Sequence, residues 1–251
     1  MHSYHYFRSL GLGVLLWLCA CVSLWAQGSF QLMGSANYMP GDCILLTPDK
    51  QFQEGLAYHT TKLDLNNFFE ITFDIFLGED DNGADGITFV IHNDPRGFNA
   101  YGTWGECMGY GRWSKNYLAG DYIAPSIAIE FDTYQNYRQN DPPYDHVAYL
   151  ENGTNYHTEY WHDNDPNYNL EDGMLHTFQF RWQPDTQQIT VWLDGAIVHQ
   201  GRRDLINDIF RGQTKVIWGF TASTGRAHNL QYFCLKRWAT EDEAASQYAG
   251  N

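Results

Sequence analysis

The sequence has little positive charge. Only 15 lysine and arginine residues accompany 30 aspartate and glutamate residues, and the formal net charge is −15 at pH 7. With so few basic side chains, the chain is a poor electrostatic match to nucleic acids and to anionic membranes. Neither is therefore expected as a partner. An acidic chain of this kind is suited to binding cations.

Long hydrophobic runs are also missing, apart from one near the N-terminus. This run covers residues 10–21, follows the single basic residue Arg8 and is short for a membrane span. Ser23-Leu24-Trp25-Ala26 follows it and offers a small residue, Ala26, at a cut before Gln27, so residues 1–26 are expected to be a signal peptide. Lipid attachment at Cys21 is the alternative. We expect a secreted or cell-surface protein with no transmembrane segment after cleavage. Removing 26 of the 251 residues leaves 225, with one arginine fewer and a formal charge of −16.

Cysteine is scarce once that segment is set aside. Cys43, Cys107 and Cys234 remain, an odd number that indicates one disulfide and one free thiol in an exported chain. Cys43 lies near the start and Cys234 near the end, which suggests a link between terminal strands, but the spacing leaves the pairing open. None of the three has Cys-x-x-Cys spacing, which argues against a structural zinc site.

Helical periodicity is rare, whereas strand patterns recur along the chain. Apolar and polar residues alternate over 69–77, and Asp194-Gly195 is a two-residue hairpin signal. The expected strands are 69–77, 87–91, 126–132, 177–182, 189–193, 196–199, 216–221 and 230–235. At least eight strands with turns between them predict an all-β protein, an antiparallel β-sandwich.

Outside the strands, the sequence predicts few other features. A short helix is expected over Arg203–Phe210. One domain is expected over 27–239, followed by a polar tail or the start of a linker over 240–251. The segment 94–122 is rich in glycine and aromatic residues. It is either a functional loop whose aromatics stack on sugar faces or a loop that buries its own aromatics.

The segment 130–146 has the densest group of metal-ligand side chains. Glu130 and Asp132 lie two apart on a predicted strand, so they share one face, where they repel each other unless a cation lies between them. The other ligand types in this segment are Asn136, Asp141 and His146. Oxygen ligands suit Ca²⁺, and the imidazole suits a transition metal. A solvated acidic loop is the alternative.

The other sequence patterns typical of catalytic or metal-binding sites are incomplete. Many β-sandwich glycosidases use Glu-x-Asp-x-Glu on one strand face, and Tyr134 stands here in place of the second Glu. No Ser-His-Asp or Cys-His grouping stands out, so catalysis is disfavoured. The segment 161–167 lacks the glycine and glutamate of an EF-hand loop and is interpreted as a solvated turn. The remaining histidines show no metal-type spacing and are interpreted as surface or packed residues: His59, His92, His157, His162, His176, His199 and His228.

Several motifs occur in a recognisable order over residues 30–238. They are Ala84-Asp85-Gly86 before an apolar strand, Gly105-Glu-Cys-Met-Gly109, Ile129-Glu-Phe-Asp-Thr-Tyr-Gln-Asn136, Asp141-Pro-Pro-Tyr-Asp-His146 and Gly219-Phe-Thr-Ala-Ser-Thr-Gly225. In this order they resemble the legume-type (L-type) lectins, most of all their bacterial surface relatives. The resemblance implies a flattened, concanavalin A-like jelly-roll sandwich.

The resemblance also implies two adjacent metal ions, Ca²⁺ and a transition metal, often Mn²⁺. Glu130 and His146 would hold the transition metal, and Asp132 and Asp141 would bridge both ions. The Asn136 side chain and the Tyr134 carbonyl would complete the calcium shell. In this family the metals do no chemistry on the sugar but lock the loop that binds it.

A sugar site next to the metals is implied as well. The Asp85 carboxylate and the Asn136 amide would bind sugar hydroxyls, and Tyr134 would offer a stacking face. Backbone N–H groups would come from near Gly105 and from Thr224, Gly225 and Arg226. The family implies a cis peptide bond at Ala84–Asp85.

Three departures from the family accompany these expectations. Glu106 replaces a glycine of the middle loop, which would narrow or recharge the sugar pocket. The loop after Gly225 is short. Cys43 and Cys234, absent from plant lectins, would join the first and last strands.

The sequence thus predicts an exported, calcium-dependent, non-catalytic carbohydrate-binding domain whose partners are glycans. One alternative is an adhesion or scaffold module with a decayed sugar site. Another is a glycosidase on the same sandwich, which the missing second glutamate disfavours. The sequence leaves open whether the domain forms a homodimer.

Overall fold

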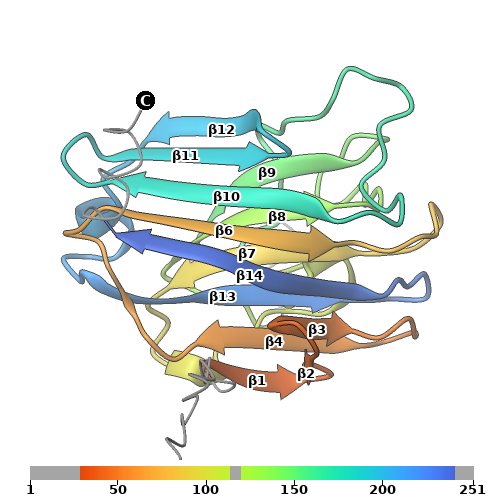
Figure 1. The fold of residues 1–251 in the computed structure, drawn as a ribbon, viewed down its shortest axis with the longest axis horizontal. Helices are drawn as coiled ribbons and strands as arrows, with labels where there is room; N and C mark the ends of the chain where they lie inside the picture. Colours follow the sequence, from red (N-terminus) through yellow and green to blue (C-terminus); the bar gives the residue numbers. More distant parts are fainter. Residues whose placement is uncertain (1–28, 114–119, 241–251) are drawn as a thin grey trace, which may run out of the picture.

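The computed structural model describes residues 29–113 and 120–240. The strands form two antiparallel sheets that lie one behind the other (Figure 1). The all-β sandwich predicted from the strand patterns is confirmed. The predicted signal peptide and polar tail lie outside the described residues, apart from Thr240 at the end of the last strand.

The first sheet positions the site. Its order is β1-β4-β13-β7-β8-β9, with a short β5 paired to β13. The strands are β1 (Phe30–Gly34), β4 (Glu54–His59), β5 (Leu63–Asp64), β7 (Gly86–His92), β8 (Ser126–Asp132), β9 (His146–Glu151) and β13 (Lys215–Ser223). β7, β8 and β9 are neighbours, with Gly86 opposite Asp132 and Asp132 opposite His146. Residues from three distant parts of the chain therefore meet at one end of this sheet.

The second sheet has the order β12-β11-β10-β6-β14-β3-β2. Its strands are β2 (Asn37–Met39), β3 (Cys43–Thr47), β6 (Phe69–Phe76), β10 (His176–Gln183), β11 (Gln188–Leu193), β12 (Ala196–Arg202) and β14 (Gln231–Thr240). Asp194 and Gly195 join β11 to β12 with φ values of 49° and 82°. Two consecutive positive φ values characterise the type I′ turn that Asp-Gly favours, so the predicted hairpin is confirmed.

The main core lies between the two sheets and consists largely of aromatic rings. Phe73 of β6 meets Phe220 of β13 edge to face at 4.7 Å, and Phe220 stacks on Phe233 of β14 at 4.2 Å. All three rings are fully buried. Such contacts contribute beyond the burial of apolar area itself and hold the two sheets in one relative position.

A second, smaller cluster covers the outer face of the first sheet. It includes Tyr58 of β4, Val90 of β7 and Ala128 of β8, packed against Tyr110 and Ile123 of the long loop. β7 and β8 are therefore buried on both faces, which explains the nearly continuous apolar run at 87–91. The same loop covers polar residues on β8, so their charges lie out of water.

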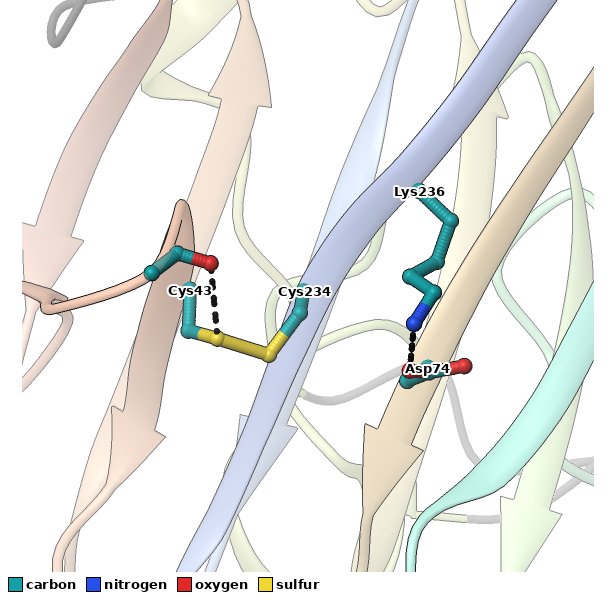
Figure 2. Close-up of a disulfide and its surroundings, with 5 residues drawn as sticks. Cys43, Asp74, Cys234 and Lys236 are labelled. Atoms are coloured by element: carbon teal, nitrogen blue, oxygen red, sulfur yellow. Dashed lines mark hydrogen bonds and ion pairs between the residues drawn. A yellow bond between two sulfur atoms is a disulfide. The ribbon is translucent and has the colours of Figure 1, made fainter.

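The first and last parts of the sandwich are joined by a disulfide. Cys43 of β3 and Cys234 of β14 are directly opposite each other and bonded, so the expected Cys43–Cys234 pair is confirmed, although it joins the third strand to the last and not the first to the last (Figure 2). Two residues further along β14, Lys236 Nζ lies 2.7 Å from Asp74 Oδ2 of the neighbouring strand β6. Cys107 is a buried free thiol, as the odd cysteine count indicates.

The connecting segments contain little helix. Residues 205–209, within the predicted helix 203–210, form a single π-helical turn, η3 (Leu205–Ile209). Asp204 caps it by accepting a hydrogen bond from the Asn207 N–H at 3.0 Å. The long loop contains two short 3₁₀ turns, η1 (Gly97–Asn99) and η2 (Gly105–Cys107). Among the described residues, no helix is long and apolar enough to cross a membrane.

Candidate metal centre and adjoining binding site

β8 presents two carboxylates on its outer face. Ile129 and Phe131 point into the main core, and Glu130 and Asp132 alternate with them on the other side. Both acids are buried because the loops cover them. Burial raises the pKa of Glu130, and burial together with the charges of Asp141 and Glu130 raises that of Asp132 well above its usual value. Buried carboxylates this close need a positive charge near them.

The loop after β8 folds back over these carboxylates. The Tyr134 N–H donates to Asp132 Oδ1 at 2.7 Å, and the Asn136 N–H donates to Asp141 Oδ2 at 2.6 Å. Asn136 Oδ1 is buried and has no hydrogen-bond partner among the described residues. A buried acceptor without a donor is costly, and a hard cation is the kind of group that satisfies it.

His146 begins β9 at the same end of the sheet. Its Nδ1 lies 3.2 Å from the Tyr144 carbonyl oxygen, whereas its buried Nε2 has no partner among the described residues. One ligand atom from each of Asp132, Asp141 and His146 lies within 4.8 Å of the other two. The structure thus brings together the side chains for which the sequence predicted a cation site, and their donor atoms suit a metal.

His157 is the residue that the sequence analysis missed. Its side chain is fully buried, Nδ1 lies 2.9 Å from Asp141 Oδ1, and Nε2 contacts Glu130 Oε2. Burial lowers the pKa of His157, but the two carboxylates outweigh it and raise the pKa to about 10. Of the surface and packed positions that the sequence left open for His157, the packed one is found, and the packing is against acids.

The position of His157 depends on contact between two loops. The His157 N–H donates to the Gln139 carbonyl at 2.8 Å, which places it beside the metal loop. Asn155, two residues earlier, donates to Glu130 Oε1 at 2.5 Å. The only sequence signal for this contact is that Asn155 and His157 are two residues apart, as side chains on one face of a strand would be. Neither residue lies in a regular strand.

Asp85 approaches the metal loop from the segment before β7. The Ala84–Asp85 peptide bond is cis, as the resemblance implies. The Thr133 N–H donates to the Asp85 carbonyl at 3.2 Å. The carboxylate is buried, and its Oδ2 has no hydrogen-bond partner among the described residues by distance and angle. Burial raises the pKa of Asp85 to about 7, and the charges of Glu106 and Asp141 add to the effect.

The middle loop contributes Gly105 and Glu106. The Gly105 carbonyl accepts the Ser223 hydroxyl at 3.0 Å, which joins η2 to the end of β13. Glu106 Oε1 lies 3.3 Å from the Gln139 side-chain nitrogen and 3.7 Å from Arg138 Nε. The negative charge of Glu106 raises the pKa of Asp85. Of the two effects expected where Glu106 replaces a glycine, a narrower or a recharged pocket, the added charge is therefore present.

The loop after β13 corrects one detail of the predicted sugar site. The Thr224 N–H donates to the Gln53 carbonyl at 2.9 Å, and the Thr224 hydroxyl donates to the Lys50 carbonyl at 2.7 Å. The N–H assigned to a sugar is therefore already used, and Thr224 instead fixes the loop. A Cβ added to Gly225 would lie 3.8 Å from Asp85 Oδ2, so this residue adjoins the carboxylate. Arg226 follows it, with its carbonyl accepting the Gln51 side chain at 2.9 Å.

Exposed aromatic rings lie on these loops. Tyr134 is 42% exposed, as a stacking face requires, and Trp104 is 48% exposed. Trp104 meets Phe52 edge to face at 6.2 Å and Trp113 at 5.7 Å. Tyr110 of the same long loop is fully buried. The buried Tyr110 ring agrees with the interpretation that segment 94–122 buries its own aromatics, whereas stacking of the exposed rings on sugar faces stays a prediction.

Comparison with known proteins finds a matching family and solved structures with a similar fold. A family model described as "Legume lectin beta-barrel domain" matches residues 25–237. The metal-free lectin I-B4 of Griffonia simplicifolia has a similar structure, with a TM-score of 0.69 at 21% identity, covering 87% of this chain and 96% of that one. The Bauhinia forficata lectin in complex with GalNAc also has a TM-score of 0.69, at 20% identity over 86% of this chain and 93% of that one.

One curated relative is similar in sequence over a shorter stretch. The pesticidal crystal protein Cry22Aa of Bacillus thuringiensis is 38% identical over 109 residues. The match covers 43% of this chain and 13% of that protein. At about 20% identity, the likeness to the solved structures establishes the fold alone.

Proposed function

The chain belongs to the legume-type lectin family, and we propose that it is an exported, calcium-dependent and non-catalytic carbohydrate-binding protein. Family and fold together favour carbohydrate binding. The observation that carries the proposal is Asp85, whose buried carboxylate oxygen Oδ2 lies beside the metal loop and has no hydrogen-bond partner by distance and angle among the described residues. A buried, unsatisfied acceptor at the edge of a loop cluster is suited to hydroxyl donors of a ligand.

The donor atoms of the metal loop fit calcium. Asp132, Asp141, the Asn136 amide oxygen and the Tyr134 carbonyl would hold it, all of them oxygen ligands. When bound, Ca²⁺ supplies positive charge that balances the buried carboxylates. The chain itself does the recognition, because Asp85 and Asn136 are the polar groups held for the sugar.

The remaining contacts follow from the same loops. Tyr134 is exposed and offers a flat face to the apolar side of a pyranose ring. The Gly225 and Arg226 N–H groups, next to Asp85, would donate to sugar oxygens, and Gly105 gives the middle loop room to approach. No step of bond cleavage is assigned, because Tyr134 occupies the position of a second catalytic glutamate.

Export is supported by the Cys43–Cys234 disulfide, which is typical of oxidising compartments. Together with the expected signal peptide it favours a secreted or cell-surface protein. N-terminal sequencing of the exported protein tests this part. A mature start at Gln27 supports signal cleavage, a lipid-modified Cys21 supports the anchored alternative, and an uncleaved cytoplasmic protein contradicts export.

Glycan binding is tested on an array, with and without EDTA. We expect binding that is lost on chelation and lost in Asp85→Ala. The matched control is Glu159→Gln, which removes an exposed acid on a neighbouring loop. Release of free sugar would contradict the non-catalytic assignment.

One observation favours a second candidate, a lectin-fold scaffold whose sugar site has decayed. The Thr224 N–H is used within the protein, and Glu106 places a second negative charge near Asp85. Absence of binding to every glycan, with calcium binding retained, would support the scaffold instead.

A further inference from the structure

His157 is held in place by its own backbone. Its N–H donates to the Gln139 carbonyl at 2.8 Å, and its carbonyl accepts from the Asn140 side chain at 2.9 Å. Both partners belong to the loop that carries Asn136 and Asp141. The imidazole is therefore positioned against the metal loop by two backbone contacts as well as by its own ring.

The two ring nitrogens of His157 meet different surroundings. Nδ1 lies 2.9 Å from Asp141 Oδ1, and Nε2 contacts Glu130 Oε2. Metal-bound histidines almost always donate the N–H of one ring nitrogen to a carboxylate or a backbone carbonyl and bind the metal with the other. An acceptor of this kind lies beside His157 Nδ1 in Asp141 and beside His146 Nδ1 in the Tyr144 carbonyl. Each imidazole thus has one nitrogen beside an acceptor, and both rings supply a ligand atom to the group that includes Glu130.

The three ligand atoms lie close to the spacing that a single ion requires. One atom from each of Glu130, His146 and His157 lies within 4.8 Å of the other two. Ligands that bind one transition metal at roughly 2.0–2.2 Å are separated by at most about twice that length. Asn155 holds Glu130 Oε1 at 2.5 Å, which leaves Oε2 on the side of the two imidazoles. This supporting hydrogen bond is what a ligating carboxylate usually has.

We propose that His157 is a ligand of the transition-metal ion, together with Glu130 and His146, and that this two-histidine, one-carboxylate set selects Zn²⁺ over Mn²⁺. Imidazole suits zinc and the later transition metals, whereas carboxylate, carbonyl and water suit manganese. A second imidazole therefore increases the preference for zinc. In this arrangement the Asp141 Oδ1 atom orients His157, and calcium keeps the oxygen-rich side of the site.

The inference concerns the identity of the ion and does not rest on sugar binding, so it is tested on metal content alone. The mature chain is stripped with a chelator and dialysed against equal concentrations of Zn²⁺ and Mn²⁺ in excess Ca²⁺. The bound metals are then measured by mass spectrometry. We expect one zinc per chain and little manganese. Manganese in preference to zinc would overturn the proposal.

The variant His157→Gln keeps a polar side chain but removes the imidazole. We expect its Zn²⁺ affinity, measured by titration calorimetry, to fall by about 10–100-fold, while its Mn²⁺ affinity changes far less. His162→Gln is the matched control, because His162 lies in the same loop outside the cluster. Retained stabilisation by Ca²⁺ shows that the variant is folded. Unchanged zinc affinity in His157→Gln would mean that His157 is not a ligand, and higher affinity would mean that it competes with the metal; either result would overturn the proposal.

A measurement on the unaltered protein covers the case in which the variant does not fold. In a ¹H–¹⁵N spectrum of the histidine rings, Zn²⁺ should shift the Nε2 resonances of two histidines. A shift of one ring alone would overturn the second imidazole ligand.

Discussion

Replacement of Asp141 by alanine should abolish calcium binding and, with it, sugar binding. Asp141 is buried, accepts the Asn136 N–H at 2.6 Å and lies 2.9 Å from His157 Nδ1. Its loss removes one calcium ligand and releases the loop that holds another. Asp85→Ala removes only the group proposed to bind sugar and should leave calcium binding intact.

The magnitude is set by linkage between binding and folding. A ligand present at 100 times its Kd stabilises the folded state by about 2.7 kcal/mol. For a domain of this size, 1 kcal/mol moves Tm by about 2–4 °C, so saturating calcium should raise Tm by roughly 5–11 °C. In Asp141→Ala this rise should vanish.

Differential scanning fluorimetry with added Ca²⁺ and with EGTA measures the rise directly. The rise is a better readout than Tm itself, because the substitution has two opposing effects on the metal-free protein. It leaves the Asn136 N–H without its acceptor, which costs about 1–3 kcal/mol, and it relieves repulsion on Asp132, whose pKa Asp141 raises. Glu159→Gln should keep the full rise. A full rise in Asp141→Ala would show that calcium binds elsewhere and would refute the assigned site.

Four further outcomes are expected. Sugar affinity should fall as the pH is lowered, because the Asp85 carboxylate must be ionised to accept hydroxyls; its metal-free pKa is about 7, and bound Ca²⁺ should place the midpoint below that value. In the metal-free protein, the free energy of unfolding should fall as the pH rises from about 4 to 7, because in this range the folded state keeps the Asp85 proton that the unfolded chain releases. Urea titrations across this pH range check the sign. Glu106→Gln removes a charge that raises the pKa of Asp85, so the midpoint for sugar binding should shift to lower pH; an unmoved midpoint would contradict this charge effect. The double variant Cys43→Ser, Cys234→Ser opens a link across 191 residues and should lose about 2–5 kcal/mol of unfolding free energy; equal stability would show that the disulfide does not constrain the unfolded chain.

Much of the fold was predictable from local pattern. The alternation at 69–77 predicts β6, and Asp194-Gly195 predicts the turn between β11 and β12, because backbone conformation and side-chain direction are local properties. The apolar run at 87–91 predicts a strand but not why both of its faces are apolar. The reason is the second cluster, where Tyr110 packs a distant loop onto the outer face of the sheet.

The ligand set was predictable only where its members are close in sequence. Glu130, Asp132 and His146 lie on or beside one strand pair, so their convergence follows from the pleat and from the turn that joins β8 to β9. Asp85 was placed near them by family resemblance, since a lone Asp-Gly is a common turn signal.

Residue chemistry and the strand period determined that this is an all-β chain and predicted a cation site after β8. The tertiary structure alone decided that His157 packs against Glu130 and Asp141, that the Thr224 N–H is already bonded and that Glu106 adds its charge beside Asp85. These three facts depend on contacts between loops. Loops have no repeating period, and their positions are set by hydrogen bonds to partners far away in the sequence, such as the bond from His157 to Gln139.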